Sequence, residues 1–147
     1  MFRSIVVGTD GSATAHAAVT RAAELAALTG ADLHVVSAYK VPSQSYAAAG
    51  AVEAMVALPV TDSEIHEQVE TMLAALARDL ERENITAVTH ARTGSAAQAL
   101  LDVAEDHKAD LIVVGSRGME GARRLLGSVP NSVSHHACCS VLIVHTA

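Results

Sequence analysis

The chain has 147 residues, enough to bury the core of one domain, and we expect residues 1–147 to form a single domain. Half of the residues are hydrophobic, but there is no Trp, one Phe and two Tyr, so a core of Ala, Val, Leu and Ile is expected. The formal net charge of −6 argues against nucleic acid or an anionic membrane as a partner, and no apolar run approaches the roughly 20 residues of a membrane helix.

The first part of the chain is predicted to form two buried strands joined by a helix. The β-branched run Ile5–Val7 precedes the loop Gly8–Ser12. Apolar residues then recur at helical spacing over Ala13–Leu28, and Gly30 is a favourable C-cap. The second strand, Asp32–Ala38, is again almost continuously apolar, as expected when helices cover both faces of a sheet.

The middle of the chain contains its least regular segment. Tyr39–Thr61 carries prolines, serines and an alanine-rich stretch, which is typical of a flexible connection or a lid and leaves room for a short helix over Ala51–Ala57. Capping residues at Thr61–Glu64 predict a helix that runs to about Arg82. Ala87–Arg92 is a weaker strand with charged residues, expected at a sheet edge.

The last third predicts two more helices and two more strands. Gly94-Ser95 opens a helix whose last turn should hold His107-Lys108, the charge that suits a helix C-terminus. Leu111–Val114 is the fourth strand, Pro130–Ala137 a helix with proline in its first turn, and Val141–Val144 the fifth strand. This alternation predicts an α/β fold with three layers, in which an open parallel five-stranded sheet carries helices on both faces.

A glycine-spaced loop follows the fourth strand. Gly115, Gly118 and Gly127 are followed by Ser128-Val129, where a helix is expected to begin. Free N–H groups and the positive end of the helix dipole would then point into the loop, which favours an anion such as phosphate. The alternative is that the glycines are ordinary turn residues and that Ser128 only caps the helix.

The loops after the first and fourth strands should meet. Ligands of open α/β sheets lie beyond the carboxyl ends of the strands, at the point where the strand order reverses. Asp10, in the loop Gly8–Ser12, would hydrogen-bond a ribose hydroxyl or hold Mg²⁺ near phosphates, or it would be a cap or turn residue of the first helix. One of Arg117, Arg123 and Arg124 is expected to contact phosphate, although a solvated face is the ordinary role of such residues.

Neither the cysteines nor the histidines indicate a metal or catalytic site. Cys138-Cys139 would form a strained disulfide, so we expect small buried residues in a reducing cytoplasm. Because the strand pattern begins at Ile5, no signal peptide is expected. The histidines are scattered and none is spaced to activate a nucleophile, so we expect no metal ligands, no catalytic residue and at most slow ATP hydrolysis; they are residues 16, 34, 66, 90, 107, 135, 136 and 145.

Three motifs resemble the universal stress protein family. They are Ile-Val-Val-Gly-Thr-Asp-Gly-Ser at 5–12, Val-Val-Gly-Ser-Arg-Gly continuing to Gly-Ser-Val at 113–129, and Ser-Val-Leu-Ile-Val-His at 140–145, and the likeness spans the whole chain. The resemblance implies a Rossmann-like fold of the adenine nucleotide alpha hydrolase type with strand order 3-2-1-4-5. It also implies ATP binding through a Gly-x2-Gly-x9-Gly-Ser/Thr pattern, and a homodimer formed through Val141–Val144.

The same resemblance implies a set of nucleotide-binding residues and a regulatory role that responds to stress or energy state. ATP is the expected ligand, with ADP or cyclic AMP as alternatives and Mg²⁺ as an open addition, while the downstream protein partner is not identified. A member that binds no nucleotide and acts through protein contacts is the other alternative. Met119–Leu126 is one residue shorter than the family pattern. The implied binding residues are Gly8, Thr9, Asp10, Ala38 beside the adenine, Gly94, Val114, Gly115, Arg117, Gly118, Gly127, Ser128 and Val129.

Overall fold

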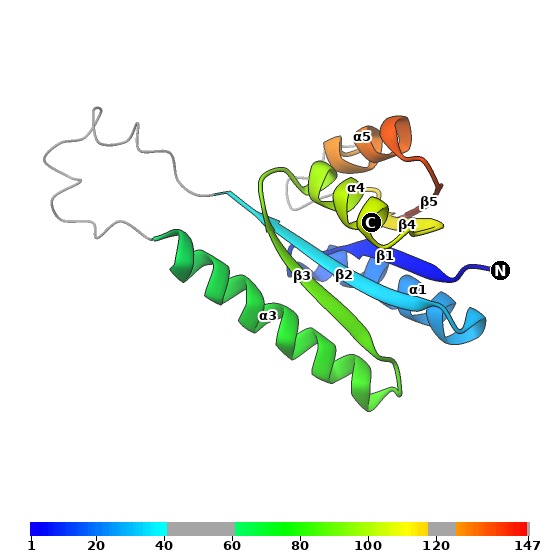
Figure 1. Ribbon diagram of the computed structural model, residues 1–147, viewed down its shortest axis with the longest axis horizontal. Helices are drawn as coiled ribbons and strands as arrows, with labels where there is room; N and C mark the ends of the chain where they lie inside the picture. Colours follow the sequence, from blue (N-terminus) through cyan, green and yellow to red (C-terminus); the bar gives the residue numbers. More distant parts are fainter. Residues whose placement is uncertain (41–60, 118–125, 147) are drawn as a thin grey trace, which may run out of the picture.

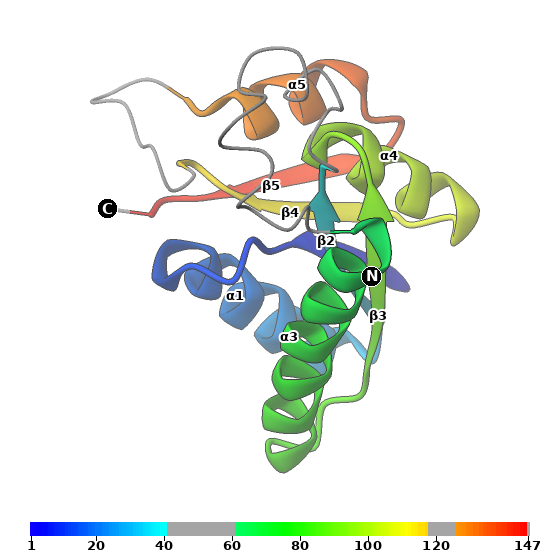
Figure 2. The ribbon, with the colours of Figure 1, turned by 90° about the vertical axis from the view of Figure 1, so that its left-hand side faces the viewer.

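The computed structural model describes residues 1–40, 61–117 and 126–146, which form a five-stranded parallel sheet between two layers of helices (Figure 1, Figure 2). The strand order is β3-β2-β1-β4-β5, so the predicted fold class and order are confirmed. The strands are β1 (Ser4–Gly8), β2 (Asp32–Tyr39), β3 (Ala87–Thr93), β4 (Leu111–Gly115) and β5 (Ser140–Val144). The helices are α1 (Ala13–Thr29), α3 (Asp62–Arg82), α4 (Ala96–Asp106) and α5 (Ser128–His136).

Side-chain alternation along the strands builds a core on each face of the sheet. In β1, Ile5 and Val7 pack in the cluster that lies against α1 and α3, whereas Val6 packs in the cluster against α4 and α5. Strand β4 repeats this alternation, and most side chains of both strands are buried. Burial on both faces explains why these strands are continuous apolar runs in the sequence.

Helix caps follow the sequence closely. Ser12 caps α1, and Gly30 ends it in the left-handed conformation at φ +71°, which glycine adopts without a Cβ penalty. Thr61 and Glu64 form the capping box of α3, as predicted. Strand β3 lies at the sheet edge, also as predicted. The short helix considered over Ala51–Ala57 lies outside the described residues.

Helix α5 begins at Ser128, where the glycine loop predicted a helix start, and two residues before the predicted range Pro130–Ala137. Its N-cap is Gly127, which makes no side-chain cap hydrogen bond. The Asn131 N–H already donates to the Gly127 carbonyl oxygen at 3.1 Å, so the first helical turn encloses Pro130. Proline is tolerated there because its missing N–H would have no helical partner. The alternative in which Ser128 is the helix cap is therefore wrong.

Two smaller expectations also need correction. Helix α4 ends at Asp106, so His107 is its C-cap and Lys108 lies beyond it at φ +49°, not in the last turn. Cys138 is exposed, because it lies in the short connection between α5 and β5 rather than in the core. Within the described segments, no helix combines the length and apolarity needed to cross a bilayer.

Candidate functional site

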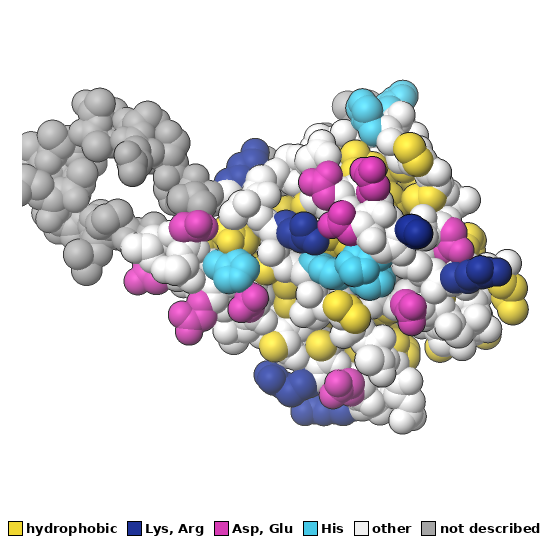
Figure 3. All heavy atoms as spheres, viewed as in Figure 1, with side chains coloured by type: hydrophobic (Ala, Val, Ile, Leu, Met, Phe, Trp, Pro, Cys, Tyr) yellow, Lys and Arg dark blue, Asp and Glu magenta, His cyan; other side chains and the backbone are white. Residues whose placement is uncertain are grey.

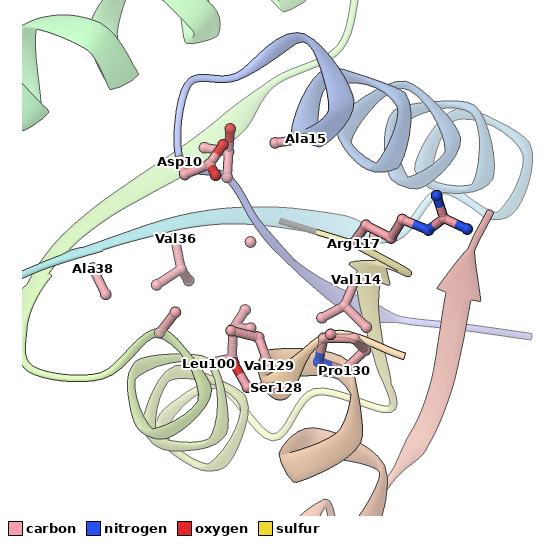
Figure 4. A pocket seen from close by; sticks show the side chains of 15 residues that line it. Asp10, Ala15, Val36, Ala38, Leu100, Val114, Arg117, Ser128, Val129 and Pro130 are labelled. Atoms are coloured by element: carbon pink, nitrogen blue, oxygen red, sulfur yellow. The ribbon is translucent and has the colours of Figure 1, made fainter. Parts of the chain in front are cut away.

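A cleft opens at the carboxyl ends of β1 and β4, where the strand order reverses (Figure 4). The space at the cleft measures about 740 Å³ when the open solvent at its mouth is included. The lining residues come from the ends of β1, β2 and β4 and from the starts of α1, α4 and α5. They are Gly8, Thr9, Asp10, Ala15, Val36, Ala38, Ala96, Leu100, Val114, Gly115, Arg117, Gly127, Ser128, Val129 and Pro130.

The loop after β1 forms one wall and holds a carboxylate in place. The Thr9 N–H donates to the Val36 carbonyl oxygen at 2.9 Å, which ties the loop to β2. Asp10 Oδ1 accepts the Ser12 N–H at 2.9 Å, and Ser12 Oγ accepts the Ala15 N–H at 3.2 Å. Asp10 is therefore a turn residue and not the cap of α1. Its side chain is exposed, and its second carboxylate oxygen remains available to accept a hydrogen bond from a ligand hydroxyl.

The loop after β4 forms the opposite wall and is closed at its base. The Gly127 N–H donates to the Ser116 carbonyl oxygen at 2.9 Å, and the Ser116 N–H donates to the Val144 carbonyl oxygen at 2.8 Å. These bonds bring the start of α5 against the end of β4. The two ends of the glycine loop therefore meet at the cleft.

Thr146 holds the loop after β4 in place through hydrogen bonds, a role that the sequence did not reveal. Its Oγ1 accepts the Arg117 N–H at 3.2 Å, and its own N–H donates to Ser116 Oγ at 3.0 Å. Thr146 is buried, and a Cβ added at Gly115 would lie 3.3 Å from its methyl carbon. Gly115 therefore permits a close approach between β4 and the segment after β5. A threonine beyond the last strand carries no local signal of such a contact.

The N-terminus of α5 supplies free backbone donors to the cleft. Gly127 offers no side-chain acceptor and Pro130 has no N–H. The amides of Ser128 and Val129 consequently have no partner within the described part of the chain, and both residues line the cleft. Free amides together with the positive end of a helix dipole attract an anion.

The floor of the cleft is apolar and built from small or branched side chains. Val36 and Ala38 come from β2, Leu100 from α4, and Val114 from β4 (Figure 4). In the same view, Asp10 and Arg117 lie on opposite sides of the cleft. A flat apolar ring with a polar, negatively charged tail matches this combination of surfaces.

The structure brings most of the residues suggested by the sequence to this cleft. Gly94 does not line it, but its φ of +108° shapes the turn from β3 into α4. Gly118, Arg123 and Arg124 lie outside the described residues. The residues placed in the lining are Gly8, Thr9, Asp10, Ala38, Val114, Gly115, Arg117, Gly127, Ser128 and Val129. The lining residues that sequence reasoning missed are Ala15, Val36, Ala96, Leu100 and Pro130, whose apolar types carry no functional signal.

Three histidines that are scattered in the sequence come together elsewhere in the molecule. His34, His90 and His107 each place a ring nitrogen within 4.8 Å of the other two. They belong to β2, β3 and the C-cap of α4, so their spacing in the sequence does not indicate that they lie together. Their separation in the sequence therefore conceals their proximity in the fold.

Comparison with known proteins gives a consistent result. The model described as the universal stress protein family matches residues 1–145. Universal stress protein Rv1636 of Mycobacterium tuberculosis (strain H37Rv) is 39% identical over 153 residues, which cover 99% of this chain and 97% of that protein.

Solved structures agree with the sequence relatives. A universal stress protein in complex with cAMP is 33% identical with a TM-score of 0.69, over 99% of this chain and 98% of that one. UspA from Lactobacillus plantarum is 24% identical with a TM-score of 0.77, over 97% of both chains, and shows the likeness of fold. Since the family model spans nearly the whole chain, this chain belongs to the universal stress protein family.

Proposed function

We propose that this chain binds ATP or a related adenine nucleotide in the cleft between the β1 and β4 loops, and acts in the cytoplasm as a regulator that responds to stress or energy state. The observation that carries the proposal is the pair of free amides at Ser128 and Val129, two residues that line a cleft with an apolar floor. Asp10 on the opposite wall adds an acceptor suited to a ribose hydroxyl.

Each part of the nucleotide has a matching surface in this proposal. The adenine would lie on the apolar floor beside Ala38, and Asp10 would accept from the ribose. The amides of α5 would donate hydrogen bonds to phosphate oxygens, and the Arg117 guanidinium, which extends away from the cleft in Figure 4, would turn inward to do the same. Asp10 is the sole carboxylate among the described lining residues, so Mg²⁺ would be held largely by the phosphates themselves.

Cyclic AMP is a second candidate, because the relative with 33% identity was solved in complex with cAMP. Its single ring phosphate needs fewer donors than a triphosphate does. The two amides of α5 and one arginine are a small donor set of this kind. ATP and cyclic AMP share the adenosine contacts, so the phosphate end would decide between them.

The first test is mass spectrometry of nucleotides released on heating freshly purified protein, followed by calorimetric titration of ATP, cyclic AMP and adenosine. We expect one adenine nucleotide per chain, with adenosine binding more weakly because it leaves the α5 amides without an anion. Absence of binding by all three ligands at millimolar concentration would refute the proposal. It would favour the alternative in which the protein acts through partner contacts alone.

Hydrolysis is expected to be slow. Among the described lining residues, Asp10 is the sole side chain with a general-base carboxylate, there is no histidine, and Asp10 is already engaged in a turn. Turnover far below about 1 s⁻¹ is therefore expected, against about 1–1,000 s⁻¹ for dedicated enzymes. Phosphate release measured over hours tests this expectation.

We further propose a homodimer formed through β5. This strand pairs with β4 along one edge, and Leu142 and Ile143 are each 37% exposed. An unpaired apolar edge invites pairing with a second copy around a two-fold axis. Leu142→Pro removes a backbone donor, so it should convert dimers to monomers in light scattering. A monomeric wild-type protein at the same concentration would contradict the proposal.

A further inference from the structure

The group His34, His90 and His107 lies on the sheet face that α4 partly covers, away from the nucleotide cleft. Helix α4 begins with Ala96 in the cleft wall and ends at its cap, His107, after 11 residues. At about 1.5 Å per residue the helix separates the two places by about 16 Å. Figure 3 shows histidine side chains gathered at the surface in the middle of this face.

His34 occupies a position where the neighbouring strands place apolar residues. It is in register with Val6 of β1, which in turn is in register with Ile112 of β4. Val6 and Ile112 are fully buried, and His34 is only 6% exposed. A buried imidazole in an otherwise aliphatic layer departs from the local pattern, and such departures are expected at functional sites.

His34 and His90 already stand at a spacing suited to two ligands of one ion. His34 Nδ1 and His90 Nε2 are 3.0 Å apart and form a hydrogen bond, which an ion bound to both nitrogens would replace. Two imidazole nitrogens on a tetrahedral zinc ion, each at about 2.0–2.1 Å, lie about 3.3 Å from each other. Both residues project from paired strands, since His90 is in register with Val36, two residues beyond His34. The sheet therefore fixes this pair without help from an ion.

His107 supplies the third nitrogen and has freedom to adjust. Its ring stacks on that of His34 with centroids 4.2 Å apart, and all three ligand atoms lie within 4.8 Å of one another. His107 is exposed at the end of α4, so a side-chain rotation can shorten its distance to the other nitrogens at little cost. A hollow at the amino ends of the strands is lined by His34 and His107 and gives access from solvent.

The surroundings keep the rings of His34 and His90 neutral. Burial, followed by the neighbouring histidines, lowers the pKa of His90 to about 4, and burial and His107 lower the pKa of His34. Metal ions bind the neutral imidazole. Asp32 and Asp106 are the carboxylates that act on the group, and Arg92 is held by Asp106 at 3.4 Å.

From this geometry we propose that His34, His90 and His107 bind one divalent transition-metal ion, with Zn²⁺ as the ion of first choice. Three imidazoles with no thiolate suit Zn²⁺, Ni²⁺ or Cu²⁺ rather than Mg²⁺ or Ca²⁺. Because His90 and His107 reach the surface, water completes the fourth position, as in open zinc sites. The histidine group shares no residue with the lining of the nucleotide cleft, so metal binding can be tested separately from nucleotide binding.

The test is calorimetric titration of Zn²⁺ into untagged, nucleotide-free protein, with Co²⁺ absorbance as a report on coordination. The variants are His34→Val, His90→Gln and His107→Gln. His34→Val restores the aliphatic layer of Val6 and Ile112 and should fold at least as well as the wild type. The control is the double variant His135→Gln and His136→Gln, which removes two exposed histidines of α5.

We expect one Zn²⁺ per chain for the wild type and the control, a tetrahedral Co²⁺ spectrum, and at least about a tenfold loss of affinity in each variant of the group. An unaltered Zn²⁺ affinity in His34→Val and His90→Gln would overturn the proposal. Loss of binding in the His135 and His136 control alone would overturn it as well, since it would place the ion on α5. Absence of stoichiometric Zn²⁺ binding by the wild type would have the same consequence.

Discussion

The N-terminus of α5 offers a substitution that separates nucleotide binding from folding. Ser128 is exposed, is the first residue of the helix, and lines the cleft beside its own free amide. Ser128→Glu places a carboxylate where the proposal places a phosphate. An acidic residue in the first turn of a helix stabilises it by about 0.3–1 kcal/mol, so the melting temperature should stay the same or rise.

The expected loss of nucleotide affinity follows from the electrostatics of this wall. Two like charges about 4 Å apart repel by about 4 kcal/mol at the effective dielectric constant near a protein surface. The exposure of Ser128 and ordinary salt reduce this to about 1.4–2.7 kcal/mol. The dissociation constant for ATP should therefore rise about ten- to hundredfold.

Two comparisons make the result specific. Asn131→Glu adds the same charge to an exposed residue one turn further along α5 that does not line the cleft, so it should leave ATP affinity nearly unchanged. Adenosine carries no phosphate, so its weak binding should be equal in the wild type and in Ser128→Glu. Calorimetric titration of both ligands into the three proteins supplies the measurement. An unchanged ATP affinity in folded Ser128→Glu would refute the placement of phosphate at α5.

Three further changes test how the fold supports the cleft. Leu73→Ala in the buried face of α3 should lower the free energy of unfolding, measured in urea, by about 2–5 kcal/mol. The control Leu28→Ala, at a 79% exposed position, should change it by less than about 0.5 kcal/mol. Similar values for the two variants would contradict the assigned core. Asp110 accepts backbone N–H groups at the start of β1, and although burial raises its pKa, these bonds hold that pKa below the ordinary value. The Asp110 carboxylate therefore stabilises the fold at neutral pH, and this stabilisation is lost as the pH falls through the lowered pKa. Asp110→Ala should lower the free energy of unfolding by about 1 kcal/mol at pH 7 and by progressively less below about pH 4. A difference between variant and wild type that does not vary with pH would contradict this role. Thr146→Val keeps the methyl group against Gly115 but removes the hydroxyl that accepts the Arg117 N–H. ATP affinity should therefore fall about fivefold with little change in melting temperature. An ATP affinity equal to that of the wild type would show that the loop after β4 does not need this hydrogen bond.

The sequence predicted the elements well where local chemistry determines them. The ends of α1 and α3 follow from Ser12, Gly30 and the Thr61–Glu64 capping box, all of which act within a few residues. The apolar runs of β1 and β4 follow from burial on both faces. The two loops that meet at the cleft were predictable because parallel strands end at the same edge of a sheet.

The sequence was less informative where a contact joins distant segments. Nothing near Thr146 indicates that its hydroxyl accepts the amide of Arg117, because β5 must first pair with β4 in the observed register. The glycine loop predicted the start of α5 at Ser128, but the predicted range Pro130–Ala137 begins two residues late, because Gly127 acts as N-cap through its backbone and offers no side-chain signal. The histidine group likewise depends on the register of β2 with β3.

The two faces of the sheet divide stability and recognition between them. Helices α1 and α3 cover their face with an aliphatic core in which even alanines of α1 are buried. Helix α4 covers the other face less completely, since no residue of β3 is fully buried and Val88 is half exposed. Both the cleft at the start of α4 and the histidine group at its end lie along this less completely covered helix.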